Sequence, residues 1–263
     1  VAVGELAPNR DGTATQRFVA QHVIDFAWGA SPHFRTQSAR AGDVHVEVFH
    51  YPGARAAARR VMQATLGGLQ LYGEWYGSYG GGLFPELTVI LTPEDAGGAG
   101  GMEYPTLFTV GAMGSKFAPA CLRMLEVETL HELAHQWFQS VIATNEAEAP
   151  WLDEGFADYS TARAMDRLYE GAMSTCVGWT LSYLAIRRLE YSLFPETLMS
   201  GTAWGLGDTY AVATYSKPAL ALTTLERHVG EEAMERFLGA YAGRYAFTHP
   251  TEADLRAVMA ETL

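Results

Sequence analysis

The stretch His131-Glu132-Leu133-Ala134-His135, followed by Glu154 in Trp151-Leu152-Asp153-Glu154-Gly155, decides how this chain is interpreted. Histidines four residues apart project from one face of a helix, so their imidazoles can bind a single metal ion. Glu154 adds a carboxylate nineteen residues after His135. Two nitrogens and one oxygen leave a fourth position open for water, which is typical of a catalytic rather than a structural zinc site. We therefore predict one Zn²⁺ per chain, bound by His131, His135 and Glu154.

Glu132 lies between the two histidines and faces the adjoining helix surface, where it can reach water without binding the metal. A carboxylate in that position can take a proton from attacking water and pass it to a leaving amine. We therefore predict that Glu132 is the general base of a hydrolytic reaction. The alternative is an ordinary amphipathic helix with surface histidines and a solvated glutamate.

Composition limits the classes of function. The chain has 263 residues, 48% of them hydrophobic, which is enough for a sizeable core. Its formal net charge is -12 with only 18 Lys and Arg, which argues against nucleic-acid binding. The sequence has no apolar run long enough for a transmembrane helix and no basic, apolar leader. It begins at Val1, which suggests a processed or excised piece, so its cellular location stays open.

The two cysteines, Cys121 and Cys176, allow one disulfide. Two free thiols are at least as common in a chain of this size. Neither cysteine belongs to a Cys-x-x-Cys or Cys/His pattern, so a cysteine nucleophile is not expected.

The hydrophobic pattern predicts an α+β fold with two lobes. Residues 1–40 form a lead-in, interpreted as the end of a missing β-domain. Residues 41–118 form an α/β lobe, and residues 119–263 form a helical lobe. The metal pair lies on the first helix of the second lobe, so zinc is expected at the seam. Expected strands are 44–49, 87–91 and an edge strand at 102–110; expected helices are 54–79, bent at Gly67-Gly68, 123–142, 152–170, 175–188, 210–229, 231–244 and 252–263.

Three further side chains are candidates for the site. Asp158 follows Glu154 by four residues, so it could orient a zinc histidine from the same helix face, or be a plain surface aspartate. Tyr215 could donate a hydrogen bond to a developing oxyanion, with Tyr210 as its competitor. Glu103 begins the edge strand and could bind a substrate's amino terminus, or be one exposed acid in a turn.

Taken together, His131-Glu-Leu-Ala-His-Gln-Trp-Phe138, Trp151-Leu-Asp-Glu-Gly155 and Gly100-Gly-Met-Glu-Tyr-Pro105 resemble the aminopeptidase N family of zinc metallopeptidases, which includes leukotriene hydrolase. The resemblance runs from about residue 40 to the end. It implies that family's thermolysin-like catalytic domain, a small mixed β-sheet lobe followed by a mainly helical lobe. It also implies that Tyr215 is catalytic, that Glu103 binds the substrate's α-amine, and that backbone at Gly100, Gly101 and Met102 lines the peptide.

Departures from the family pattern are few. Tyr104 replaces a frequent Asn, and Pro218 replaces a frequent Gly. The family's usual N-terminal β-rich domain, which supplies a second acid for the amine, and its C-terminal helical domain do not fit in this chain, so flanking domains of a longer parent protein are expected. The predicted function is that of a zinc aminopeptidase acting on peptides with a free N-terminus. The alternatives are a thermolysin-like endopeptidase, and a catalytic-domain fragment that binds peptide without turnover.

Overall fold

A four-stranded mixed sheet forms the first part of the fold. The computed structural model describes residues 2–93, 96, 100–111, 121–176 and 180–263. Strands β3 (Arg35–Ala41), β4 (Val44–His50), β5 (Glu86–Thr92) and β6 (Leu107–Gly111) lie in the order β3-β4-β5-β6. β3 is antiparallel to β4, whereas β5 and β6 continue the sheet in parallel. The predicted mixed sheet is therefore confirmed, and the predicted lead-in contains its outermost strand, β3.

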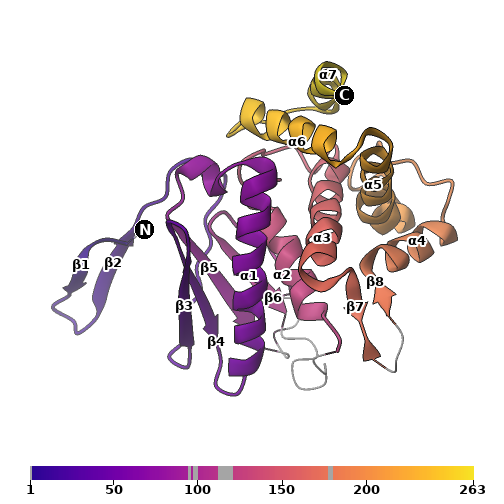
Figure 1. Cartoon of the computed structure of the whole chain (residues 1–263). Helices are drawn as coiled ribbons and strands as arrows, with labels where there is room; N and C mark the ends of the chain where they lie inside the picture. The colour runs from indigo at the N-terminus through magenta and orange to yellow at the C-terminus, as the bar shows by residue number, and fades with distance from the viewer. Residues whose placement is uncertain (1, 94–95, 97–99, 112–120, 177–179) are drawn as a thin grey trace.

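The chain begins with an antiparallel pair, β1 (Ala2–Pro8) and β2 (Ala14–Phe18), which stands off the main sheet in Figure 1. The boundary predicted near residue 118 lies outside the described residues. The sheet nevertheless precedes the helices along the chain, as the predicted α+β class requires.

Helix α1 (Arg55–Tyr76) joins β4 to β5 and packs against the sheet and α2, with residues such as Val61, Leu69 and Tyr72 buried in the core. It is one continuous helix, so the bend predicted at Gly67-Gly68 is wrong. A Cβ atom on Gly68 would lie 2.5 Å from Leu133 Cδ2 and 2.8 Å from Leu130 Cδ2. The glycine therefore allows close approach of the helix that carries the two histidines.

The helical part follows, and Figure 1 shows α1, α2 and α3 side by side. Its elements are α2 (Met124–Ala134), η2 (Pro150–Leu152), α3 (Glu154–Tyr169), β7 (Ala172–Ser174), β8 (Leu181–Ser182), α4 (Tyr183–Leu193), η4 (Gly207–Thr209), η5 (Val212–Ser216), α5 (Lys217–Val229), α6 (Glu231–Tyr245) and α7 (Glu252–Thr262). Among the described residues, no helix combines the length and apolar character that a membrane crossing requires.

Two predicted helices differ from the structure. The helix predicted at 123–142 ends at Ala134, because the chain turns where Gln139 adopts a φ of 120° and Ser140 N donates to His135 O at 2.9 Å. The helix predicted at 175–188 begins only at Tyr183, where the Ser182 side chain accepts a hydrogen bond from Ala185 N. β8 lies near the middle of that range, and its partner β7 ends just before the range begins.

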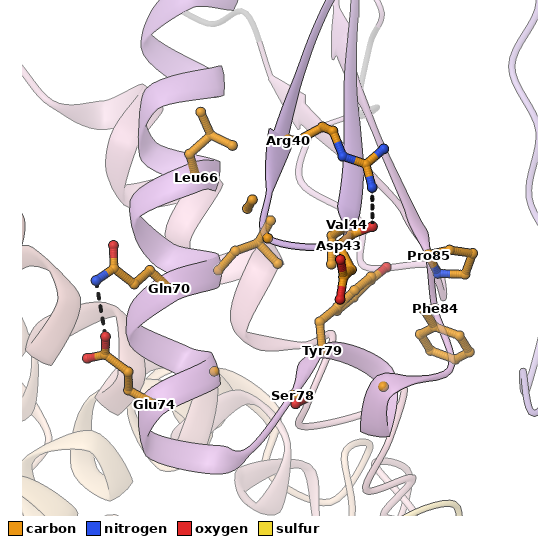
Figure 2. Close-up of a pocket in the computed structure, with 15 residues that line it drawn as sticks. Arg40, Asp43, Val44, Leu66, Gln70, Glu74, Ser78, Tyr79, Phe84 and Pro85 are labelled. Carbon is orange, nitrogen blue, oxygen red and sulfur yellow. Dashed lines mark hydrogen bonds between the residues drawn. The ribbon is translucent and has the colours of Figure 1, made fainter.

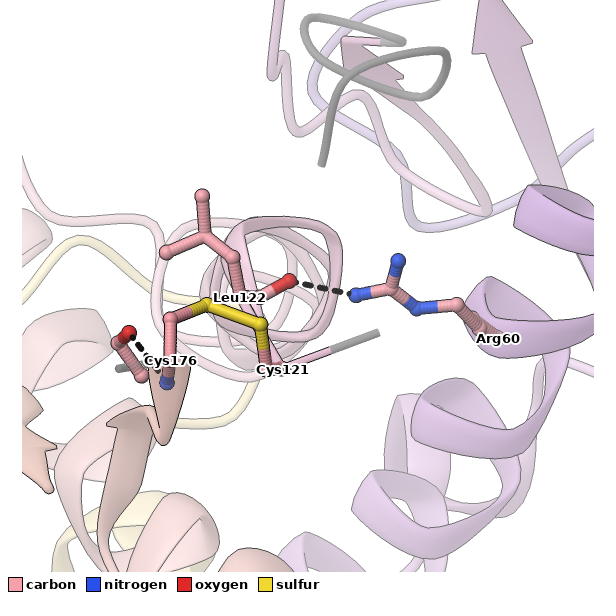
Figure 3. Close-up of a disulfide and its surroundings, with 5 residues drawn as sticks. Arg60, Cys121, Leu122 and Cys176 are labelled. Carbon is pink, nitrogen blue, oxygen red and sulfur yellow. Dashed lines mark hydrogen bonds between the residues drawn. A yellow bond between two sulfur atoms is a disulfide. The ribbon is translucent and has the colours of Figure 1, made fainter. Parts of the chain in front are cut away.

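Cys121 and Cys176 form a disulfide across 55 residues of sequence, which resolves the choice left open above (Figure 3). The bond joins the chain just before α2 to the chain just after β7. Beside it, Arg60 Nη2 donates to Leu122 O at 2.8 Å and lies 2.7 Å from Glu126 Oε2. The disulfide therefore closes a loop that contains both α2 and α3.

Candidate metal centre

Three ligand atoms converge between α2 and α3. His131 and His135 lie one turn apart, and Glu154 is the first residue of α3. Glu154 Oε2 lies 3.0 Å from His131 Nε2 and 3.2 Å from His135 Nε2, and the two Nε2 atoms are 3.2 Å apart. In a tetrahedral zinc site with bonds of 2.0–2.1 Å, ligand atoms stand about 3.3 Å apart. The triangle therefore has nearly the size that zinc requires, and these residues can hold a metal ion.

The far nitrogens of both imidazoles face carboxylates. His135 Nδ1 lies 2.7 Å from Asp153 Oδ1, and His131 Nδ1 lies 3.3 Å from Asp158 Oδ1. A carboxylate accepts a hydrogen bond from a ring N–H, so each Nδ1 carries the proton and each Nε2 presents a lone pair. Two nitrogen lone pairs and a carboxylate oxygen at this separation repel one another unless a cation lies between them. The donor set therefore fits Zn²⁺.

Protons compete with a metal ion for the lone pairs of His131, His135 and Glu154. Burial disfavours the charged form of His131, but hydrogen bonds to Asp158 and Glu154 raise its pKa to about 10. Burial likewise opposes the charge of Glu154, yet the two imidazoles hold its pKa well below the ordinary value. Glu154 is therefore a carboxylate at neutral pH, and without metal its negative charge attracts protons to the histidines.

Glu132 is buried beside this group, with 6% of its surface exposed. Within the described part of the chain, its Oε2 atom has no hydrogen-bond partner. Burial raises its pKa to about 7, against the opposing effect of the two histidines. Gly101 packs so close that a Cβ atom there would lie within 2.0 Å of Glu132 Oε1. A carboxyl group with this pKa and a free oxygen can exchange protons near neutral pH.

Tyr215 lies in η5 and donates a hydrogen bond of 2.6 Å to Glu154 Oε1. Burial, followed by the charge of Glu154, raises the pKa of Tyr215, so its phenol stays protonated. The ring of Tyr210 lies 6.3 Å from the ring of Tyr215, centroid to centroid. Of the two tyrosines weighed from the sequence, Tyr215 is the one whose hydroxyl is hydrogen-bonded to a candidate ligand.

Residues 100–104 do not begin a strand, so the strand predicted at 102–110 is too long. Only 107–111 form β6, at the edge of the sheet, and Thr109 N donates to Met102 O at 2.9 Å. Met102 thus folds back antiparallel along β6. The turn follows from Pro105, which lacks a backbone N–H, and from Thr106, which has a φ of 63°. The segment brings Gly100 and Gly101 against Glu128 and Glu132.

Glu103 is buried rather than exposed, and its carboxylate lies within 4.8 Å of ligand-type atoms of His135 and Asp153. Burial, and then the charge of Glu103, raises the pKa of both Asp25 and Glu146. A cluster of carboxylates therefore lies beside the metal ligands. Such a cluster favours a cationic group.

Sequence reasoning missed several of these neighbours. Asp153 adjoins Glu154 in the chain, so its position next to a ligand was a usable signal. Asp25 comes from the lead-in, and Arg187 comes from α4, where its Nε atom lies 2.6 Å from Asp158 Oδ2; both are far from the motif in sequence. No spacing rule connects them to it.

A surface pocket between α1, the β3–β4 turn and η1 (Tyr79–Gly82) contains none of the candidate site residues (Figure 2). Its polar side chains contact protein groups instead. Gln70 Nε2 donates to Glu74 Oε1 at 3.1 Å, and Arg40 Nη2 donates to Asp43 O at 2.8 Å. The pocket therefore does not compete with the metal centre as the candidate active site.

Comparison with known proteins finds relatives that are named aminopeptidases. Aminopeptidase M1-D of Oryza sativa subsp. japonica is 25% identical over 223 residues, which are 82% of this chain and 25% of that protein. Endoplasmic reticulum aminopeptidase 2 of Homo sapiens is 26% identical over 220 residues, 81% of this chain and 22% of that protein. The chain thus spans about a quarter of the length of these curated relatives.

The fold is also shared with solved structures. An M1 zinc metallopeptidase from Deinococcus radiodurans matches with a TM-score of 0.61 at 20% identity, over 87% of this chain and 48% of that one. Residues 83–263, more than half of the sequence, match the family model described as the peptidase family M1 domain. These findings confirm the resemblance found in the motifs. The chain belongs to peptidase family M1.

Proposed function

We propose that this chain is the catalytic unit of a zinc-dependent aminopeptidase, which hydrolyses the N-terminal residue from peptides. The observation that carries the proposal is the convergence of lone pairs on His131, His135 and Glu154 beside the buried carboxyl group of Glu132. The names of relatives in rice and human, both called aminopeptidases, support the reaction. The name of the related Deinococcus zinc metallopeptidase supports the metal.

His131, His135 and Glu154 would hold the ion, with Asp158 and Asp153 fixing the two imidazoles. Zinc, when bound, supplies a Lewis acid that acidifies water and polarises a carbonyl. Glu132 then serves as the base that accepts a proton from the attacking water and returns it to the leaving amine. The phenol of Tyr215 stays protonated at neutral pH, so it can donate a hydrogen bond to the developing oxyanion.

Glu103 is the residue that would make the enzyme prefer substrates with a free amino terminus. It lies in an acidic group with Asp25 and Glu146, and a substrate ammonium would offset part of that charge. Gly101 packs against Glu132 and Gly100 lies near Glu128, so the backbone of Gly100, Gly101 and Met102 would line the peptide beside the proposed base. Asp25 belongs to the lead-in, so this chain itself provides a second acid near Glu103.

The test uses the purified chain, its zinc content and a panel of aminoacyl-fluorophore substrates. We expect one zinc per chain and hydrolysis that a chelator abolishes. Glu132→Gln should keep the zinc and lose at least about 10²–10⁴-fold in kcat, because it removes the base but no ligand. Full activity in Glu132→Gln would refute the mechanism.

A second comparison separates exopeptidase from endopeptidase activity. A peptide with a free amine should be cleaved, whereas its N-acetylated twin should not, because Glu103 would face an uncharged amide. Equal cleavage of the two would favour the thermolysin-like endopeptidase. Zinc binding with peptide capture but no cleavage would favour a binding role.

A further inference from the structure

Arg187 of α4 lies behind the metal centre and contacts its surroundings on two sides. Its Nε atom lies 2.6 Å from Asp158 Oδ2, and its Nη2 donates to Asp158 Oδ1 at 3.0 Å and to Tyr183 OH at 2.7 Å. Tyr183 OH in turn donates to Asp158 Oδ1 at 2.5 Å. Asp158 is completely buried, and a buried carboxylate requires an opposite charge. Arg187 supplies that charge.

The same carboxylate faces a metal ligand. Asp158 Oδ1 lies 3.3 Å from His131 Nδ1. The orientation of this carboxylate therefore sets the orientation of the imidazole ring, and with it the direction in which the Nε2 lone pair points. The guanidinium of Arg187 approaches both oxygens of Asp158: Nη2 donates to Oδ1, while Nε lies 2.6 Å from Oδ2 without the geometry of a hydrogen bond. A planar, forked guanidinium held against a carboxylate in this way constrains its direction as well as its charge. Arg187 therefore controls the orientation of His131 through Asp158.

On its other side, Arg187 is connected through Glu190 to η5, the segment that carries Tyr215. Nη1 of Arg187 donates to Glu190 Oε2 at 2.8 Å, and Ser216 Oγ donates to the same oxygen at 2.5 Å. Ser216 adjoins Tyr215, whose ring centroid lies 6.0 Å from the guanidinium carbon. One side chain thus connects the support of His131 to the support of Tyr215.

We propose that Arg187 is a positioning residue of the metal centre, which aligns His131 through Asp158 and holds the Tyr215 segment through Glu190. This inference rests on the metal site of the proposed function, and goes beyond it by assigning a role to α4. Tyr183 of that helix is buried, and Leu184 and Ile186 are partly buried against the core, so the polar contacts of Arg187 add to an apolar attachment of α4. Arg187 touches neither a ligand atom nor substrate in this scheme.

The test measures zinc affinity directly, by competition with a chelator at a temperature well below the melting point. Arg187→Met should weaken zinc binding about ten- to a hundred-fold, as removal of partners behind metal ligands usually does. Arg187→Lys keeps the charge that Asp158 needs but not the fork, so it should fold and bind zinc with an intermediate affinity. The matched control is Arg188→Met, which removes the same charge from the exposed neighbouring position and should leave zinc affinity unchanged.

Two further measurements separate positioning from a purely structural role. The absorption spectrum of the cobalt-substituted protein should change in Arg187→Met but not in Arg188→Met, because it reports ligand geometry. In a double-mutant cycle, Arg187→Met should add little to the loss of zinc affinity caused by Asp158→Asn. Folded Arg187 variants with wild-type zinc affinity and spectrum, or additive losses in the cycle, would overturn the inference.

The outcomes that would refute the proposed function differ from those that would refute the role of Arg187. A wild-type chain that binds zinc but hydrolyses nothing would refute the aminopeptidase, while the difference in zinc affinity between Arg187→Met and Arg188→Met would still support positioning. A wild-type chain that binds no zinc would overturn both proposals.

Discussion

Gly155→Ala should damage the site by separating α3 from α5. A Cβ atom on Gly155 would lie 2.6 Å from Pro218 Cβ, 2.7 Å from Pro218 Cγ and 3.3 Å from Thr214 O. Carbon atoms normally pack at about 3.5–4.0 Å, so the two segments must separate by about 1 Å. Neither the proline ring nor the backbone can rotate away. Glu154 precedes this glycine and Tyr215 lies in the same segment as Thr214 and Pro218, so the 2.6 Å hydrogen bond between them should lengthen.

The expected cost has a structural part and a catalytic part. Overpacking costs about 1–3 kcal/mol, and the better helix propensity of alanine offsets about 1 kcal/mol of it. The remaining loss of about 0–2 kcal/mol corresponds to a decrease in melting temperature of up to about 8 °C. A displacement of about 1 Å in a catalytic group can reduce kcat/KM about a hundred-fold.

The assay for this variant pairs melting curves with steady-state hydrolysis. Gly73→Ala is the matched control, because Gly73 also lies inside a helix but a Cβ atom there would meet nothing within 4 Å. The control should be as stable as the wild type or more stable, with unchanged activity. If Gly155→Ala matched Gly73→Ala in both measurements, the close contact with Pro218 would have no role in holding Glu154 against Tyr215.

Two other predictions concern the disulfide and the metal. Cys176→Ser opens a loop of 55 residues and should lower the free energy of unfolding by up to about 4 kcal/mol, measured by denaturant titration; an unchanged midpoint would contradict a role for the bond in stability. Because the pKa of His131 is raised from 6.5 to about 10, its proton stabilises the metal-free fold most below pH 6.5, and this stabilisation is lost as the pH rises to 10. Zinc replaces that proton, so it should raise the melting temperature more at pH 9 than at pH 7, and equal increases would contradict the competition.

The candidate metal ligands could be proposed from the sequence because their geometry is local. A spacing of four residues aligns two side chains on any helix, so His131 and His135 needed no tertiary information. Asp158 was one helical turn from Glu154, and the same periodicity placed it near the site. Glu103 and Tyr215 were candidates among alternatives, and only the family resemblance favoured their roles, because their distances in sequence follow no geometric rule.

Other elements depended on contacts that the sequence pattern does not contain. β3 was not predicted because Arg35–Ala41 is polar and largely exposed, and it becomes a strand by pairing with β4. The helix that carries the histidines was predicted too long because Trp137 and Phe138 fit a helical pattern, although both are buried in a turn. Burial alone therefore does not distinguish a helix from a packed turn.

The buried charge of the candidate centre is strongly negative, which favours the binding of cations. Glu103, Glu132, Asp153, Glu154 and Asp158 surround the two histidines, and each is buried or nearly so. Arg187 offsets one of these charges through its contact with Asp158. Uncompensated carboxylates in a protein interior either bind protons or bind cations. In the function that we propose, a divalent metal at the histidines and a substrate ammonium group near Glu103 would together offset most of the remaining charge, so a single acidic cluster would bind both.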